Sequence, residues 1–160
     1  MKAKPTFTRN DINQDIRIFL EVEDKKIKMA LIYIGLQIVT EARQKTKIIK
    51  PPPLDYPHEK SGFYDLTGNL RSSIGFEVQK DKKTIEKNFA KTKNGSEGYS
   101  KGMQKAKEIA NKYNGWVLTI VAGMDYAVLV ESKGYDVISS SVWLKEKVKS
   151  QIKNLTVLKW

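Results

Sequence analysis

The chain offers few side chains that could catalyse a reaction. It contains one histidine, His58, and no cysteine among its 160 residues. Any histidine-based mechanism would depend on His58, and such a histidine needs an orienting partner and a nucleophile beside it. His58 follows a run of prolines and has no serine-nucleophile signature nearby, so we interpret it as a solvated loop histidine. A single histidine without cysteine also argues against a zinc site.

Carboxylates could serve a metal-dependent nuclease if they clustered near a lysine. Asp65, Glu77 with Lys80, Asp125 and Glu131 are available. Glu77 and Lys80 lie three residues apart, so they point to opposite faces of a strand, and we interpret these carboxylates as solvated charges at strand ends. Neither a P-loop nor a dinucleotide-binding glycine pattern occurs. The sequence therefore predicts no metal, no cofactor and no small-molecule substrate.

A basic surface is the other candidate. The net charge is +11, and residues 80–114 carry 10 lysines against 4 acidic side chains. These lysines could face nucleic acid or a protein partner, with Tyr99 and Tyr113 available to stack, or they could form an ordinary solvated face. Only 4 of the 29 basic residues are arginines, which favours a diffuse positive field over base readout. The lysines of the candidate surface are Lys80, Lys82, Lys83, Lys87, Lys91, Lys93, Lys101, Lys105, Lys107 and Lys112.

Hydrophobic spacing predicts a helical N-terminal region over residues 11–47. Its apolar side chains recur on a 3.6-residue period from Ile27 onward. The charged stretch 21–26 separates them from a shorter apolar stripe, which predicts a short helix joined or kinked into a long one. We expect Asn10 or Asp11 to be the N-cap, residues 1–10 to form an extended arm, and the proline-rich residues 48–63 to form a loop.

Alternating apolar residues predict an antiparallel hairpin after that loop. One strand contains Ile74, Phe76 and Val78, and residues 84–90 form the second. A loop over 91–98 and a basic helix over 99–113 follow, so residues 80–114 form a hairpin arm with an inserted helix. The nearly continuous apolar run 116–122 predicts a central strand covered on both faces.

Apolar stretches at 126–130 and 135–138 precede a last helix from about Ser140. The chain thus reads as one α+β domain over residues 1–160. We expect a long N-terminal helix packed on a small, mainly antiparallel sheet, with a basic helix near residue 100 and a C-terminal helix. The longest apolar run is too short to span a bilayer.

Two segments carry a more specific pattern, DLTGNLRSSI at 65–74 and VAGMDYAVLVE at 121–131. In the first, Gly68 permits a left-handed turn, Thr67 can cap the backbone after it, and Leu70 and Ile74 are expected in the core. Arg71 offers a five-donor fork, which we expect to meet a carboxylate, either Glu131 or Asp125.

Together these segments resemble the tail-completion or head–tail joining proteins of the neck of tailed bacteriophages. The matching positions are Thr67, Gly68, Asn69, Leu70, Arg71, Ser73, Ile74, Gly123, Tyr126, Ala127 and Glu131. The order of helix, proline loop, first motif, second motif and final helix is also similar, so the resemblance covers most of the chain. The basic helix near residue 100 looks inserted relative to that pattern.

The resemblance implies a structural virion protein without catalytic activity, located at the neck or tail and assembled in the bacterial host cytoplasm. It implies a homo-oligomeric ring, six-fold or twelve-fold, contacting portal, adaptor or tail proteins. The basic surface would then face passing phage DNA or an acidic neighbouring ring. A stand-alone basic nucleic-acid-binding protein is the alternative, and a metal-dependent nuclease ranks below both.

Overall fold

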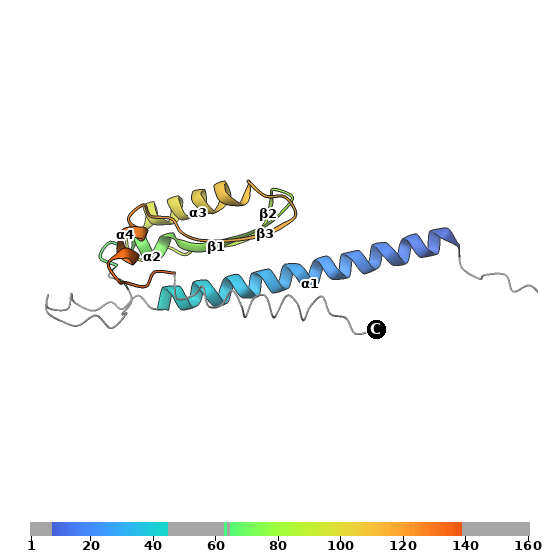
Figure 1. Ribbon diagram of the computed structural model, residues 1–160, viewed down its shortest axis with the longest axis horizontal. Coiled ribbons are helices and arrows are strands. Elements are labelled where there is room, and N and C mark those ends of the chain that lie inside the picture. The colour runs from blue at the N-terminus through green and yellow to red at the C-terminus, as the bar shows by residue number, and fades with distance from the viewer. Residues whose placement is uncertain (1–7, 45–62, 64, 139–160) are drawn as a thin grey trace, which may run out of the picture.

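The computed structural model describes residues 8–44, 63 and 65–138 and has an α+β architecture (Figure 1). The long helix α1 (Arg9–Gln44) precedes the short helix α2 (Asn69–Ser73) and the strands β1 (Ile74–Lys80) and β2 (Lys83–Asn88). Helix α3 (Ser96–Ala110), strand β3 (Trp116–Ala122) and helix α4 (Ala127–Ser132) follow. The sheet lies between α3 on one face and the C-terminal half of α1 on the other (Figure 1). The α+β prediction is confirmed.

Helix α1 is one continuous helix, so the short and long segments predicted on either side of residues 21–26 are joined without a break. The charged residues there are good helix formers without glycine or proline, and Lys26 pairs with Glu23 at 2.7 Å within the helix. The N-cap is Thr8 instead of Asn10 or Asp11. Its Oγ1 accepts the Asp11 N–H at 3.3 Å, while the Asp11 carboxylate accepts the Thr8 N–H at 2.7 Å. The last residues of the predicted arm 1–10 are therefore helical.

The C-terminal half of α1 packs on the sheet. All its buried residues lie from Leu31 onward, and Gly35 receives the Phe76 ring, which leaves no room for a Cβ. Arg43 fixes the start of β1, donating to the Ile74 carbonyl through Nη2 at 2.6 Å and Nε at 3.1 Å. It also donates to Asn88 Oδ1 at 3.1 Å, so one side chain ties α1 to both strands of the hairpin.

The sheet order is β2-β1-β3, with both pairs antiparallel. The predicted hairpin is confirmed, and its turn residues Asp81 and Lys82 both have positive φ, as a tight two-residue turn with the right twist requires. Strand β3 was predicted to be central, and this is wrong. Strand β1 is the central strand, and β3 forms an edge of the sheet with most residues only half-buried.

Helix α3 lies close to the sheet because its buried stripe consists of small residues. The stripe contains Gly98, Gly102, Ala106 and Ala110 at four-residue spacing. A Cβ on Gly102 would lie 2.5 Å from the Ser73 carbonyl oxygen. The helix begins at Ser96, so the last three residues of the predicted 91–98 loop are helical. Phe63, at the end of the predicted proline loop, is buried in the core.

The rest of that loop, His58 and the predicted C-terminal helix from Ser140 lie outside the described residues. No helix in the described part of the chain is long and apolar enough to cross a membrane.

Candidate functional site

The first motif segment forms a tight turn into α2. Gly68 has φ +84°, and a Cβ there would lie 2.1 Å from the Thr92 carbonyl oxygen, so both its conformation and its surroundings require glycine. Thr67 Oγ1 accepts the Asn69 N–H at 3.2 Å, as the predicted cap does. Leu70 and Ile74 are buried, which confirms their predicted place in the core.

Serines complete this turn. Ser73 Oγ donates to the Leu70 carbonyl at 2.7 Å, and Ser72 Oγ accepts the Thr92 N–H at 2.9 Å. Ser72 and Ser73 are both fully buried. The motif therefore holds the 91–95 loop against α2, and these contacts give it a packing role.

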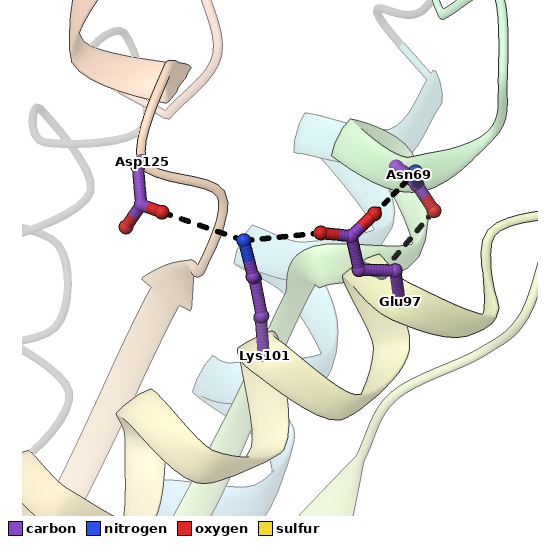
Figure 2. Close-up of polar contacts among 5 residues, drawn as sticks. Asn69, Glu97, Lys101 and Asp125 are labelled. Atoms are coloured by element: carbon purple, nitrogen blue, oxygen red, sulfur yellow. Dashed lines mark hydrogen bonds and ion pairs between the residues drawn. The ribbon is translucent and has the colours of Figure 1, made fainter.

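The two motif segments, about fifty residues apart in sequence, meet through α3. Asn69 on α2 donates from Nδ2 to Glu97 Oε2 at 3.3 Å and accepts the Gly98 N–H at 3.2 Å. Lys101 then bridges Glu97 at 3.0 Å and Asp125 at 3.4 Å (Figure 2). The Glu97 carboxylate, and to a smaller extent the Asp125 carboxylate, raises the pKa of Lys101. We call Asn69, Glu97, Lys101 and Asp125 the junction network.

A backbone contact reinforces the junction. The Gly123 N–H donates to the Ser73 carbonyl at 3.1 Å. A Cβ on Gly123 would lie 2.5 Å from Gly102 Cα, so two glycines let the backbone of α3 touch the end of β3. Ala127, another motif position, is buried where α4 begins. The motif residues thus share one place in the fold, where α2, α3 and the β3–α4 turn converge.

Burial shifts the pKa of two titratable side chains beside the junction network, Asp65 and Tyr126. Burial raises the pKa of Asp65, opposed by hydrogen bonds from the Gly68, Leu70 and Arg71 backbone and by the charge of Lys93. Burial also raises the pKa of Tyr126, assisted by the charges of Asp65 and Glu97.

Arg71 was predicted to pair with Glu131 or Asp125. Asp125 lies beside Lys101, and Glu131 Oε1 accepts the Ile138 N–H at 2.8 Å. The Arg71 Nε is buried without a hydrogen-bond partner. Arg71 lies close enough to Arg43 that its charge, after burial, lowers the pKa of Arg43. The contacts described for the two carboxylates do not use Arg71, and the predicted ion pair stays a prediction.

The candidate nuclease carboxylates do not converge. Glu77 was interpreted as a solvated charge at a strand end, but it is 3% exposed. Its Oε1 accepts hydrogen bonds from Gln79 Nε2 at 2.8 Å and Thr84 Oγ1 at 2.6 Å. Among the described residues, no group of three or more histidine, cysteine, aspartate or glutamate side chains could hold a metal ion.

Ion pairs and hydrogen bonds occupy much of the predicted basic surface. Lys80 pairs with Asp24 of α1 and lies over the Trp116 ring, 5.3 Å from its centroid. Lys101 belongs to the junction network. Lys105 and Lys112 both lie near Glu108, at 3.6 and 3.8 Å.

The remaining lysines are spread over the β hairpin, the 91–95 loop and α3. Lys93 donates to the Asp65 carbonyl at 3.1 Å, and Lys91 lies 5.3 Å from the centroid of Tyr99. Lys82 and Lys83 stand at the hairpin turn, Lys87 on β2 and Lys107 on α3, all exposed. The ten lysines therefore do not form one uncompensated patch.

The apolar stripe upstream of residue 21 was identified from the sequence, but its exposure to solvent was not predicted. The N-terminal half of α1 projects past the end of the sheet (Figure 1), and its large apolar side chains are 42–57% exposed. A long helix whose buried residues begin only at Leu31 leaves these side chains without cover from the sheet. The signal was present as a second apolar stripe, because Ile18, Val22, Met29 and Leu36 fall outside the core-facing period. The exposed side chains of the projecting half are Ile12, Ile16, Ile18, Phe19, Leu20 and Val22.

Comparisons with models of protein families, with curated proteins and with solved structures found no match for this chain.

Proposed function

We propose that this protein is a structural subunit of the neck or tail of a tailed bacteriophage, which assembles with its own copies into a ring and contacts neighbouring portal, adaptor or tail proteins. The resemblance of the two motif segments motivates the proposal. Its place is the virion, reached by assembly in the host cytoplasm. The chain acts by binding, without a catalytic step.

The observation that carries the proposal is the projecting half of α1, residues 9–22. A helix of 36 residues is about 54 Å long at 1.5 Å per residue, whereas the seven-residue strands β1 and β3 span roughly 23 Å. The first contacts of α1 with the sheet are those of Asp24 with Lys80 and Trp116, so residues 9–22, about 21 Å of helix, extend past the sheet. A large apolar surface of this kind marks a protein–protein contact, and rings arise from such contacts when the rotation between copies closes.

The junction network supports the same conclusion. Asn69, Glu97, Lys101 and Asp125 are held by one another, and the motif glycines allow close packing. Together these contacts bring α2, α3 and the β3–α4 turn into one packed junction. The motif thus has a physical role that needs no substrate.

Binding to DNA as a free-standing protein is the weaker alternative. Nucleic-acid binding without sequence readout depends on lysines that can neutralise phosphates. Lys80, Lys101, Lys105 and Lys112 already face carboxylates. Tight, salt-sensitive binding of the monomer to duplex DNA, together with no self-association, would favour this alternative.

Self-association can be tested by sedimentation velocity between about 1 and 100 µM. We expect species of higher mass than the 18.3 kDa chain, with six or twelve copies as the closed forms. Ile16→Asp or Phe19→Asp should shift the distribution to lower mass. The matched control Asn10→Asp adds the same charge at an exposed position, about 120° around the helix from Ile16 and about 80° from Ile18, and it should leave the distribution unchanged.

The virion role has its own test. The gene is disrupted in the source phage, and lysates are inspected by electron microscopy and plated. We expect separate heads and tails and a loss of plaques, both restored by the wild-type chain supplied in trans. Intact, infective particles from the disrupted phage would refute the proposal.

A further inference from the structure

We propose that the open edge of β3 pairs antiparallel with β3 of a second copy, around a twofold axis at Thr119, to form a continuous six-stranded sheet. This pairing does not depend on the proposed neck role. It rests on the backbone register, on the composition of the strand and on one buried hydroxyl group.

The register shows which backbone groups of β3 point outward. The Gly123 N–H donates to the Ser73 carbonyl at 3.1 Å, and the Asp81 N–H donates to the Gly115 carbonyl at 3.0 Å. Hydrogen-bonded pairs alternate in an antiparallel ladder, so the odd-numbered residues of β3 bond to β1. The N–H and C=O groups of the even-numbered residues therefore point away from β1, at Trp116, Leu118, Ile120 and Ala122.

No strand in the described part of the chain lies beyond these groups, because the sheet ends at β3. Of the backbone hydrogen bonds that the described residues form outside the helices and strands, none involves these outward residues. Helices α1 and α3 cover the two faces of the sheet, not this edge. A row of unsatisfied donors and acceptors along an apolar strand is a template for another strand.

The two edges of the sheet differ in composition. Strand β2 carries Lys83, Glu86 and Lys87, and the β1–β2 register is interrupted by an irregularity between Val78 and Gln79. Charges and bulges are the devices that protect an edge against pairing. Strand β3, with the sequence WVLTIVA, has neither charge nor proline nor glycine. Of the two edges that the described strands form, only that of β3 is therefore open to a partner strand.

A second copy of β3 fits this edge in one register. When Thr119 faces Thr119 of the copy, Leu118 faces Ile120 and Trp116 faces Ala122, so every outward residue meets another outward residue. Each outward residue then donates its N–H to the residue facing it and accepts a hydrogen bond from that residue with its C=O. Side chains on the α1 face meet side chains on the same face, and Val117 meets Val121 on the α3 face. A shift of the register by one residue would place backbone groups that point away from β1 opposite groups that point toward the copy's own β1. These backbone hydrogen bonds would then be lost.

Thr119 provides an independent indication. Its side chain is 6% exposed, and its Oγ1 has no hydrogen-bond partner, which is costly for a buried hydroxyl. In the proposed register the two Thr119 residues form a non-hydrogen-bonded pair, the position where side chains approach most closely. Rotation about Cα–Cβ would bring the two hydroxyls within reach of each other, since threonine pairs across strands do hydrogen-bond.

Because the chain has no cysteine, single cysteine variants report the pairing directly. Cα atoms of a non-hydrogen-bonded pair lie about 4.5 Å apart, within the range that a disulfide spans. Under mild oxidation, Thr119→Cys should form a covalent dimer. The control Thr84→Cys lies on the charged edge and is more exposed, so chance collisions would cross-link it faster. Faster dimer formation by Thr119→Cys supports the pairing, and equal or slower formation overturns it.

A second pair of variants tests the register and remains informative if Thr119→Cys misfolds. Val117→Cys and Val121→Cys should cross-link when mixed and much less when each is oxidised alone, because only unlike positions face each other. Cross-linking of either one alone at the rate of the mixture would overturn the register. Repeating the experiment with Phe19→Asp added separates the two proposals, because that change disrupts contacts through α1 and leaves the β3 edge intact.

Discussion

Gly98 offers a sharp test of the packing between α3 and the motif turn. It lies in the first turn of α3, and its N–H donates to Asn69 Oδ1 at 3.2 Å. A Cβ added there would lie 1.8 Å from the Asn69 carbonyl oxygen and 2.6 Å from its carbonyl carbon. Both atoms belong to the backbone, so no side-chain rotation relieves the contact, and Gly98→Ala must move α3 away from α2.

The expected magnitude follows from two opposing effects. Overpacking of this kind costs about 1–3 kcal/mol, whereas replacing glycine by alanine in a helix gains at most about 1 kcal/mol. The gain is smaller in the first turn, where the helix is less constrained. We therefore expect Gly98→Ala to lower the free energy of unfolding by about 2 kcal/mol, which corresponds to roughly 4–8 °C in the thermal midpoint at this chain length.

Urea unfolding followed by far-UV circular dichroism measures the effect. The midpoint should fall while the slope stays unchanged, because the surface exposed on unfolding is the same. Ser100→Ala is the matched control, since it lies two residues further on with an exposed side chain; it should change stability by less than about 0.5 kcal/mol. If Gly98→Ala unfolds at the same or a higher urea concentration than the wild type, the close approach of α3 to α2 is refuted.

Three further predictions concern polar contacts. Arg43→Met should lower the free energy of unfolding by about 2–3 kcal/mol, because it leaves the buried Ile74 carbonyl without its charged donor; urea midpoints measure this, and a change below about 0.5 kcal/mol would contradict it. Burial raises the pKa of Asp65, so the folded state favours the protonated carboxyl group and the contribution of Asp65 to stability falls as pH rises through that pKa. We expect Asp65→Asn to flatten the pH dependence of the thermal midpoint above the ordinary aspartate range. An unchanged pH profile would count against the burial of Asp65. Lys101→Met should lower the thermal midpoint at low salt and have less effect at high salt. In the wild type, the contribution of Lys101 to stability should disappear only as the pH rises through its raised pKa. A shift of the thermal midpoint that does not depend on salt would argue that Lys101 acts through packing alone.

The junction network explains why two separate motif segments belong together. Asp125 and Asn69 are far apart in sequence, yet both contact side chains of α3. A helix inserted between the hairpin and β3 thus connects the two segments. The lysine that connects them was predicted to be part of a basic surface, because a sequence alone does not show which carboxylate lies opposite a given lysine.

Local patterns predicted most of the elements. The 3.6-residue period of α1, the alternation of β1 and the run of apolar residues in β3 each reflect neighbours within a few residues of each other. The Gly68 turn was also predictable, because a single glycine at this position permits the left-handed backbone conformation that the turn requires. The α1 N-cap was displaced by two or three residues, because Thr8 and Asp11 cap each other reciprocally.

The sequence by itself determined where α1, α3 and the three strands form and which residues could anchor the motif turn, whereas the short helices α2 and α4 were not predicted. Only the tertiary structure decided that β1 is central, that β3 is an edge and that residues 9–22 of α1 extend past the sheet. The physical reason is that the apolar side chains of a strand are buried by the helices that pack on the two faces of the sheet. The position of the strand within the sheet depends instead on backbone hydrogen bonds to strands from distant parts of the sequence. The composition of β3 fits a strand with neighbours on both sides, and residues 8–44, 63 and 65–138 supply only one.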